Sequence, residues 1–229
     1  MRISRRFALH GFLLLLPLLF PTAAKAEEPS RWEKDMGAFR EREAESPSPE
    51  GAVLFVGSST VRLWDLKASW PNETMVNNGF GGSTLADAIR HFDTLIEPYH
   101  PGAVVIYSGD NDMSKGRGIK GTTADFKTLA ERVQKIHPGS PVLILAIKPS
   151  AKRWNLWPEM KQVNEAVAAF CASGNGLHFV DIATPMLGEG DAMPDPSWFR
   201  DDGLHLSEKG YAEWTRIVGG VLREAGALK

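Results

Sequence analysis

The chain has 229 residues, a net formal charge of −2 at pH 7 and a single cysteine, Cys171. This length suits one domain with a full hydrophobic core, and the mildly acidic charge argues against nucleic-acid and anionic-membrane partners. One cysteine excludes an intramolecular disulfide, so we expect packing to hold the fold together and Cys171 to be a buried small hydrophobe.

The first 26 residues have the features of a secretory signal peptide. Three arginines precede an apolar run over residues 7–20, and the small-x-small sequence Ala24-Lys25-Ala26 follows. The run is short and interrupted by Pro17, so it is a poor membrane span, with an uncleaved anchor as the alternative. We therefore expect cleavage after Ala26 and an exported protein, periplasmic or secreted, without stable membrane insertion. Two adjacent arginines do not decide between the general and twin-arginine export routes.

Beyond the signal peptide, helical patterns alternate with short apolar runs. Residues 27–50 are predicted to form an N-terminal helix and linker, and residues 51–229 a single domain. The predicted strands cover residues 52–57, 74–77, 103–107, 142–147 and 178–182. The intervening helices have inner faces made of Leu85, Ile89, Phe92 and Ile96; Phe126, Leu129, Val133 and Ile136; Met160, Val163, Val167 and Phe170; and Tyr211, Trp214, Val218 and Val221. Strands separated by helices predict βαβ units and a parallel sheet.

The first strand runs directly into hydroxyl residues. The apolar run Val53–Val56 is followed by Gly57-Ser58-Ser59, and the next residues can begin a helix. Such a turn lies at the carboxyl edge of a parallel sheet, where open α/β folds bind ligands, and close to helix-end N–H groups. Ser58 or Ser59 is therefore a candidate nucleophile, the alternative being that both serines cap the helix.

Other polar groups follow at the same expected edge or just before the last helix. Asn111 lies after the third strand, and Asp202 and His205 are three residues apart. A carboxylate can hold one nitrogen of an imidazole while the other faces a hydroxyl, and an amide can donate to an oxyanion. These groups together are those that acyl transfer requires. Taken singly, the Asp-x-x-His sequence is also typical of a helix-entry cap, and Asn111 of a turn.

The motifs Gly57-Ser58-Ser59, Gly82, Gly109–Asp112 and Asp202–His205 occur in that order, and together they resemble the four sequence blocks of the SGNH/GDSL hydrolase superfamily. The resemblance implies a flavodoxin-like three-layer α/β/α sandwich with a five-stranded parallel sheet. It makes Ser59 the nucleophile and Asp202 and His205 its partners. It also implies an oxyanion hole formed by Ser59, Gly82 and Asn111. The sequence departs from the family pattern at Ser58, where the family has an aspartate.

The function that follows is that of an exported serine hydrolase, which cleaves a small-molecule ester, a lipid or an acylated carbohydrate through an acyl-enzyme. No histidine has a partner at metal-ligand spacing, and neither a metal nor an organic cofactor is expected. Two other functions fit the same fold: a catalytically silent glycan-binding protein, and an acyltransferase that uses the same acyl-enzyme.

Three tryptophans are candidates for substrate contact. Trp154 and Trp157 lie in the segment that leaves the fourth strand at the edge carrying Ser59, and Trp198 lies just ahead of Asp202. Aromatic faces can stack on sugar rings or line an acyl pocket. The alternative for Trp154 and Trp157 is packing against the following helix.

Overall fold

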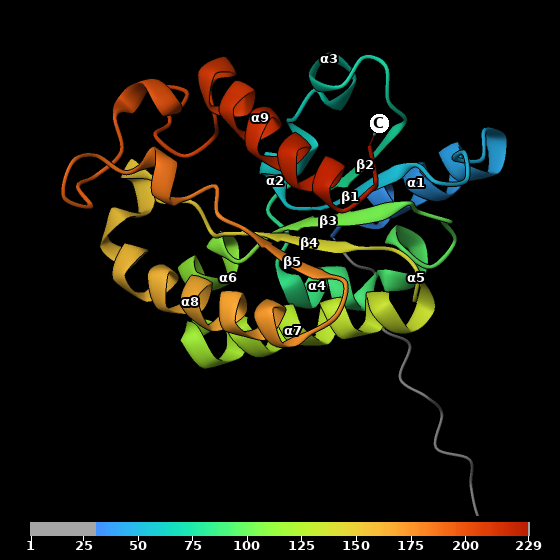
Figure 1. The fold of residues 1–229 in the computed structure, drawn as a ribbon, viewed down its shortest axis with the longest axis horizontal. Coiled ribbons are helices and arrows are strands. Elements are labelled where there is room, and N and C mark those ends of the chain that lie inside the picture. Colours follow the sequence, from blue (N-terminus) through green and yellow to red (C-terminus); the bar gives the residue numbers. More distant parts are fainter. Residues whose placement is uncertain (1–30, 229) are drawn as a thin grey trace, which may run out of the picture. The chain divides into compact units, whose positions relative to one another are not determined.

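Five short strands form a parallel sheet in the computed structural model, which describes residues 31–228 (Figure 1). The strands are β1 (Val53–Gly57), β2 (Met75–Gly79), β3 (Ala103–Tyr107), β4 (Val142–Leu145) and β5 (Leu177–Val180), in the spatial order β2-β1-β3-β4-β5. The predicted signal peptide lies outside the described residues. Within residues 31–228, no helix combines the length and the apolar character that a membrane crossing requires.

Helices cover both faces of the sheet and make three layers, as the resemblance implied. In Figure 1, α9 lies on one face with α2 and α3, whereas α4, α5, α7 and α8 lie on the other. The α-helices are α1 (Glu33–Glu45), α2 (Ser59–Arg62), α3 (Leu66–Ser69), α4 (Leu85–Arg90), α5 (Phe92–Leu95), α6 (Asp110–Ser114), α7 (Gly118–Ile136), α8 (Trp157–Ser173) and α9 (Glu208–Glu224). Short 3₁₀ helices are η1 (Ala151–Leu156), η2 (Thr184–Met186) and η3 (Pro196–Trp198).

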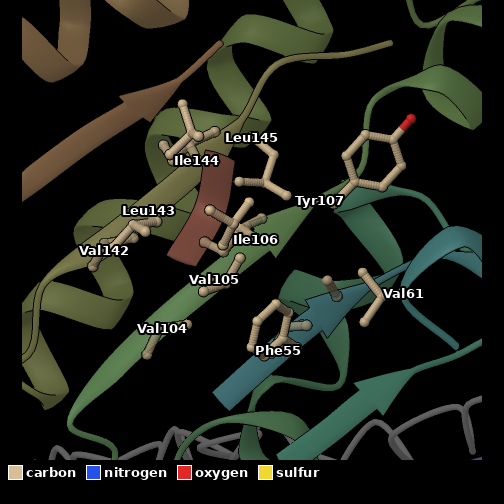
Figure 2. Packing of buried hydrophobic residues seen from close by; sticks show 14 of the residues in the cluster. Phe55, Val61, Val104, Val105, Ile106, Tyr107, Val142, Leu143, Ile144 and Leu145 are labelled. Atoms are coloured by element: carbon tan, nitrogen blue, oxygen red, sulfur yellow. The ribbon is translucent and has the colours of Figure 1, made fainter. Parts of the chain in front are cut away.

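The centre of the sheet forms the core. Every residue of β1, β3 and β4 is buried, which explains why these strands read as continuous apolar runs without alternation. Figure 2 shows the side chains of these strands packed around one another, with Tyr107 at the end of β3. Cys171 is buried on α8, as predicted.

The helix predicted from Leu85, Ile89, Phe92 and Ile96 is divided in two. Thr84 and Asp87 form a capping box at the start of α4, but His91 leaves the helical conformation and α5 begins at Phe92. The break lets the inner face turn, so that Leu85 on α4 and Leu95 on α5 are both fully buried. A continuous amphipathic pattern therefore predicted one helix where the packing favours two.

The last positions of the predicted inner faces on α7 and α9 differ from the structure, as does Phe170 on α8, which is only partly buried next to the buried Cys171. Ile136 is 39% exposed because it ends α7, where the chain turns away at His137. On α9, Trp214 and Val218 are fully buried as predicted, but Leu222 enters the core where Val221 was expected. The inner stripe of a straight helix drifts by one residue over several turns, and this explains the second difference.

The N-terminal helix packs with the rest of the described chain. Trp32 and Met36 are buried in the same hydrophobic cluster as the sheet. The Arg42 guanidinium at the end of α1 donates to the Asn77 carbonyl and the Asn78 side chain, and both asparagines belong to β2. Helix α1 is therefore fixed to the strand next to β1.

The order of the strands brings the motif residues to one place. From β1 the chain continues to β2 at one edge of the sheet, and from β3 it continues through β4 to β5 at the other edge. The order in which strands are added to the sheet therefore reverses between β1 and β3. Ligand sites of open α/β sheets lie beyond the carboxyl ends of strands at this reversal. Ser59 follows β1 and Asn111 follows β3, so both residues border it.

Candidate active site

The turn after β1 separates the two candidate serines. Gly57 has φ +159°, and a Cβ there would lie 2.0 Å from the Tyr107 carbonyl oxygen, so only glycine fits this approach of β1 to β3. Ser58 is fully buried, and its hydroxyl has no hydrogen-bond partner among the described residues. Ser59 is partly exposed and begins α2. A substrate can therefore reach Ser59 but not Ser58.

Ser59, His205 and Asp202 form a hydrogen-bonded chain. The Ser59 Oγ lies 2.9 Å from His205 Nε2, and His205 Nδ1 lies 2.6 Å from Asp202 Oδ2. An imidazole held in this way by a carboxylate can take a proton from the hydroxyl at its other nitrogen. The structure thus brings together three residues that are up to 146 positions apart in the sequence.

The loop before α9 is built to hold this arrangement. The second carboxylate oxygen of Asp202 accepts hydrogen bonds from the Leu204 and His205 backbone N–H groups, each at 2.9 Å. Gly203, which lies between Asp202 and Leu204, has φ +64°, a conformation that favours glycine. Ser207 caps α9 by accepting from the Gly210 N–H. The short Asp-x-x-His spacing thus places both side chains on one side of a tight turn.

The Asp202 carboxyl group is held in its ionised form. Partial burial acts to raise its pKa, but the hydrogen bonds from the His205 ring and from the two backbone N–H groups outweigh this effect and lower the pKa to about 2. A carboxylate that is ionised at all ordinary assay pH values can only accept a proton at its hydrogen bond to Nδ1. The His205 ring therefore carries its proton on Nδ1 and presents a bare Nε2 to Ser59 when it is neutral.

The loop after β2 lies beside this serine turn. The Phe80 N–H donates to the Gly57 carbonyl at 2.9 Å, and the Ser83 hydroxyl donates to the Phe80 carbonyl at 2.9 Å. Gly82, in the same loop, has φ +73°. The loop that carries Gly82 is therefore tied directly to the residue that precedes Ser58 and Ser59.

Asn111 joins the same group from β3. It lies in the first turn of α6, is 8% exposed, and its side-chain amide donates to the Ser83 carbonyl at 2.9 Å. The Ser59 N–H also lies in the first turn of a helix, where backbone N–H groups have no partner within the helix. The structure therefore gathers the Ser59 backbone, the Gly82 loop and the Asn111 amide, which are the three predicted donors to an oxyanion.

The three candidate tryptophans are placed differently. Trp157 begins α8 and is 7% exposed, and Trp154 in η1 is partly buried with its ring stacked on Trp157, at 6.3 Å between centroids. Trp198 in η3 is partly exposed and has the Lys209 ammonium over its ring at 4.6 Å. The Lys152 N–H donates to the Gly203 carbonyl, so η1 lies against the Asp202–His205 turn.

Charged residues that the sequence reasoning did not assign also lie here. Lys148, Asp110 and Arg153 form two ion pairs, and Arg153 contacts Asn111. Lys148 directly follows the predicted strand over residues 142–147, at the carboxyl edge of the sheet. A lysine at this position could have been predicted from the sequence to lie near the site. Among the described residues, no three His, Cys, Asp or Glu side chains gather closely enough to hold a metal ion.

Comparison with known proteins now decides the family. The sequence profile of the GDSL-like Lipase/Acylhydrolase family matches residues 57–213, which include both Ser59 and His205. The chain belongs to this family. Its members are acylhydrolases, so this protein is an ester hydrolase, and the resemblance inferred from the sequence motifs is confirmed. A comparison with curated proteins found no match.

Solved structures of GDSL-type proteins share the fold. A GDSL-like lipase from Bacteroides thetaiotaomicron is 19% identical with a TM-score of 0.73, over 83% of this chain and 98% of that chain. A carbohydrate esterase of family 3 from Talaromyces cellulolyticus is 17% identical with a TM-score of 0.59, over 78% and 99%. An acetyl-xylooligosaccharide esterase from Geobacillus Stearmophilus is 19% identical with a TM-score of 0.61, over 78% and 96%. At these identities the likeness is one of fold.

Proposed function

We propose that this acylhydrolase is an exported serine esterase that works through a covalent acyl-enzyme on Ser59. The observation that carries the proposal is the unbroken chain from the Ser59 hydroxyl through His205 to Asp202, with separations of 2.9 and 2.6 Å. A serine hydroxyl is a weak nucleophile until a base removes its proton, and this chain supplies the base and its orienting carboxylate.

In the first half of the reaction, the Ser59 Oγ attacks the ester carbonyl carbon while His205 Nε2 takes the hydroxyl proton. The C–O bond to the alcohol then breaks, and His205 returns the proton to the departing alcohol oxygen. In the second half, His205 takes a proton from water, whose oxygen attacks the acyl-enzyme carbonyl. The acid leaves, and the proton returns to Ser59.

Each attack converts a carbonyl oxygen into an oxyanion, which needs hydrogen-bond donors. We assign this role to the Ser59 and Gly82 backbone N–H groups and to the Asn111 side-chain amide. The position of Ser59 in the first turn of α2 supports the assignment, because the backbone N–H groups of a first turn have no partner within the helix.

The substrate is a small ester or an acylated carbohydrate. Two of the similar solved structures are described as a carbohydrate esterase and an acetyl-xylooligosaccharide esterase. The half-buried Trp154 belongs to η1, which contacts the Asp202–His205 turn through the Lys152 N–H and the Gly203 carbonyl, and its ring is of the kind that sugar rings stack on.

The proposal is tested by hydrolysis of p-nitrophenyl acetate by the purified protein without residues 1–26. We expect hydrolysis by the wild type, a loss of several orders of magnitude in Ser59→Ala, and a far smaller effect in the matched variant Ser58→Ala. Absence of hydrolysis in the wild type would remove the proposed function, and a greater loss in Ser58→Ala would move the nucleophile to Ser58.

A panel of acetylated sugars and simple alkyl esters tests the substrate proposal. Trp154→Ala is expected to change the ranking of substrates more than the melting temperature, because its ring is only partly buried. The comparison variant is Trp157→Ala, which removes a buried ring and is expected mainly to lower stability. An unchanged ranking together with a lower melting temperature in Trp154→Ala would make this residue part of the packing.

Export is proposed from the sequence of the first 26 residues. Expression of the full chain in a bacterial host is expected to yield a protein whose N-terminus is Glu27 and which is recovered outside the cytoplasm. An intact N-terminus on a protein that stays in the cytoplasm would contradict export.

A further inference from the structure

A group of buried charges lies under the oxyanion side of the site. The Lys148 side chain is fully buried, and its ammonium lies 3.1 Å from Asp110 Oδ2 and 3.0 Å from the Tyr107 hydroxyl. The Arg153 guanidinium pairs with the same Asp110 oxygen, at 3.1 Å from Nη1. Burying charged groups costs free energy even when they are paired. A buried charged cluster next to the candidate active site therefore suggests a function in catalysis.

Arg153 connects this cluster to Asn111. Its Nη2 donates to Asn111 Oδ1 at 2.8 Å, while its Nη1 forms an ion pair with Asp110, the residue directly before Asn111, without a hydrogen bond among the described residues. A guanidinium is rigid and planar, so the charge attraction at one of its nitrogens restricts the positions from which the other nitrogen can donate. Arg153 is therefore fixed by Asp110 and in turn fixes Asn111.

The Arg153 and Ser83 contacts together decide which way the Asn111 amide faces. Arginine can only donate hydrogen bonds, so the amide atom opposite Arg153 must be the oxygen. The NH₂ group then faces the other way, where one of its hydrogens is used by the Ser83 carbonyl at 2.9 Å. The second hydrogen is left for an oxyanion. A flipped amide would place its oxygen there and repel negative charge.

We propose that Arg153 is a positioning residue for ester hydrolysis, which orients and polarises the Asn111 amide as a donor to the oxyanion. The proposal rests on the proposed function, in which Asn111 donates to that oxyanion. A cation on the amide oxygen also draws electron density from the nitrogen and makes its N–H a stronger donor. The Arg153 side chain is only 16% exposed, consistent with action through Asn111 and not by direct contact with substrate.

Asp110 is ionised in this arrangement, as the role requires. Burial acts to raise the pKa of Asp110, but the positive charges of Lys148 and Arg153 outweigh it and hold the pKa below its usual value. The Tyr107 hydroxyl remains protonated because burial, together with the Asp110 charge, raises its pKa well above the ordinary value. Asp110 therefore keeps its negative charge, and the Tyr107 hydroxyl stays neutral.

The test is a double-mutant cycle with p-nitrophenyl acetate, using Arg153→Met, Asn111→Ala and the double variant. The matched control is Lys152→Met, which removes an exposed cation from the same short helix. We expect Arg153→Met to lower kcat by about ten- to a hundredfold with KM changed less than about twofold, because the lost interaction acts on the oxyanion. The double variant is expected to be no slower than Asn111→Ala alone, and Lys152→Met to resemble the wild type.

Three results would overturn the inference: an unchanged kcat in Arg153→Met, a rise in KM alone, or independent effects that multiply in the double variant. If Arg153→Met does not fold, as judged by circular dichroism, Arg153→Lys carries the same test. Lysine keeps a cation beside Asp110 but lacks the fork that reaches Asn111, so kcat should still fall in an Asn111-dependent way. Wild-type turnover that Ser59→Ala abolishes keeps the proposed function intact when the inference fails.

Discussion

At the scale of single residues, the burial of Ser58 is the most informative difference from the family pattern. The family places an aspartate before the nucleophilic serine, whereas this chain places a fully buried hydroxyl without a partner among residues 31–228. An unpaired buried hydroxyl is a cost to folding, so Ser58→Ala should leave the free energy of unfolding unchanged or slightly higher. Ser59 alone combines exposure with a hydrogen bond to His205.

Asp202 is expected to matter for turnover and not for folding. Asparagine at this position still accepts from backbone N–H groups through its oxygen, but its NH₂ group cannot accept from His205 Nδ1, so the ring adopts the wrong tautomer. We expect Asp202→Asn to lower kcat on the order of a hundred- to ten-thousandfold. The melting temperature should change by only a few degrees.

The neighbouring Asp201 provides the control for this substitution. Asp201 is exposed, and the carboxylate that is hydrogen-bonded to His205 Nδ1 belongs to Asp202. Asp201→Asn should therefore retain close to wild-type kcat in the same assay. A greater loss of kcat in Asp201→Asn than in Asp202→Asn would transfer the orienting role to Asp201.

At the scale of elements, the short helices carry the information that the sequence reasoning lacked. All five strands were predicted to within a few residues, because buried parallel strands leave apolar runs that end at turn residues. Helix α6 is only five residues long, too short for a periodic signal, so the sequence predicts no helix for the Asn111 segment, although Asn111 is a candidate oxyanion donor. The Arg153 contact depends on the path of η1, which tertiary packing determines.

The carboxyl group of Asp112 caps α6, and it gives a pH dependence of stability. Burial raises its pKa to about 6, although hydrogen bonds from backbone N–H groups, including Leu85 and Gly109, act in the opposite direction. Between pH 4 and 6 the folded state therefore binds more protons at this residue than the unfolded state does. Its contribution to the free energy of unfolding is full below pH 4 and declines as the pH rises through 6.

Urea unfolding at several pH values tests this prediction with Asp112→Asn. The difference between the two proteins in free energy of unfolding should shift by up to about 3 kcal/mol between pH 4 and 7, to the disadvantage of the wild type at the higher pH. The change with pH is the diagnostic quantity, because asparagine also alters the cap itself. A difference that stays constant across this range would show that Asp112 titrates as an ordinary carboxyl group.

At the scale of the whole described unit, distant segments meet because the sheet order reverses between β1 and β3. The motif order along the chain was enough to predict this meeting, since the resemblance supplied the topology that local patterns do not contain. Helix α9 then completes the site, because the turn carrying His205 leads directly into it. The anchoring of α9 by Trp214 therefore supports the position of His205.

Removal of the Trp214 side chain should be costly. Its ring is fully buried and packs against Trp64 and Tyr107, with centroids 5.7 and 4.9 Å away. We expect Trp214→Ala to lower the free energy of unfolding by about 3–5 kcal/mol in urea. The control is Met193→Ala, because Met193 is 49% exposed and should change stability by less than about 0.5 kcal/mol. Similar small effects for both would place α9 outside the cooperative core.

The central claim, that Ser59 is the nucleophile of an acyl-enzyme, is tested most directly by labelling the protein with a fluorophosphonate and mapping the adduct by peptide mass spectrometry. The probe reacts with a serine only where a base activates the hydroxyl, and in this structure that base is His205 at 2.9 Å from Ser59 Oγ. We expect one adduct, on Ser59, that is absent from Ser59→Ala. An adduct on Ser58 would contradict the role of Ser59 as the nucleophile. So would an adduct on any other residue if the labelled protein still hydrolysed esters at the full rate.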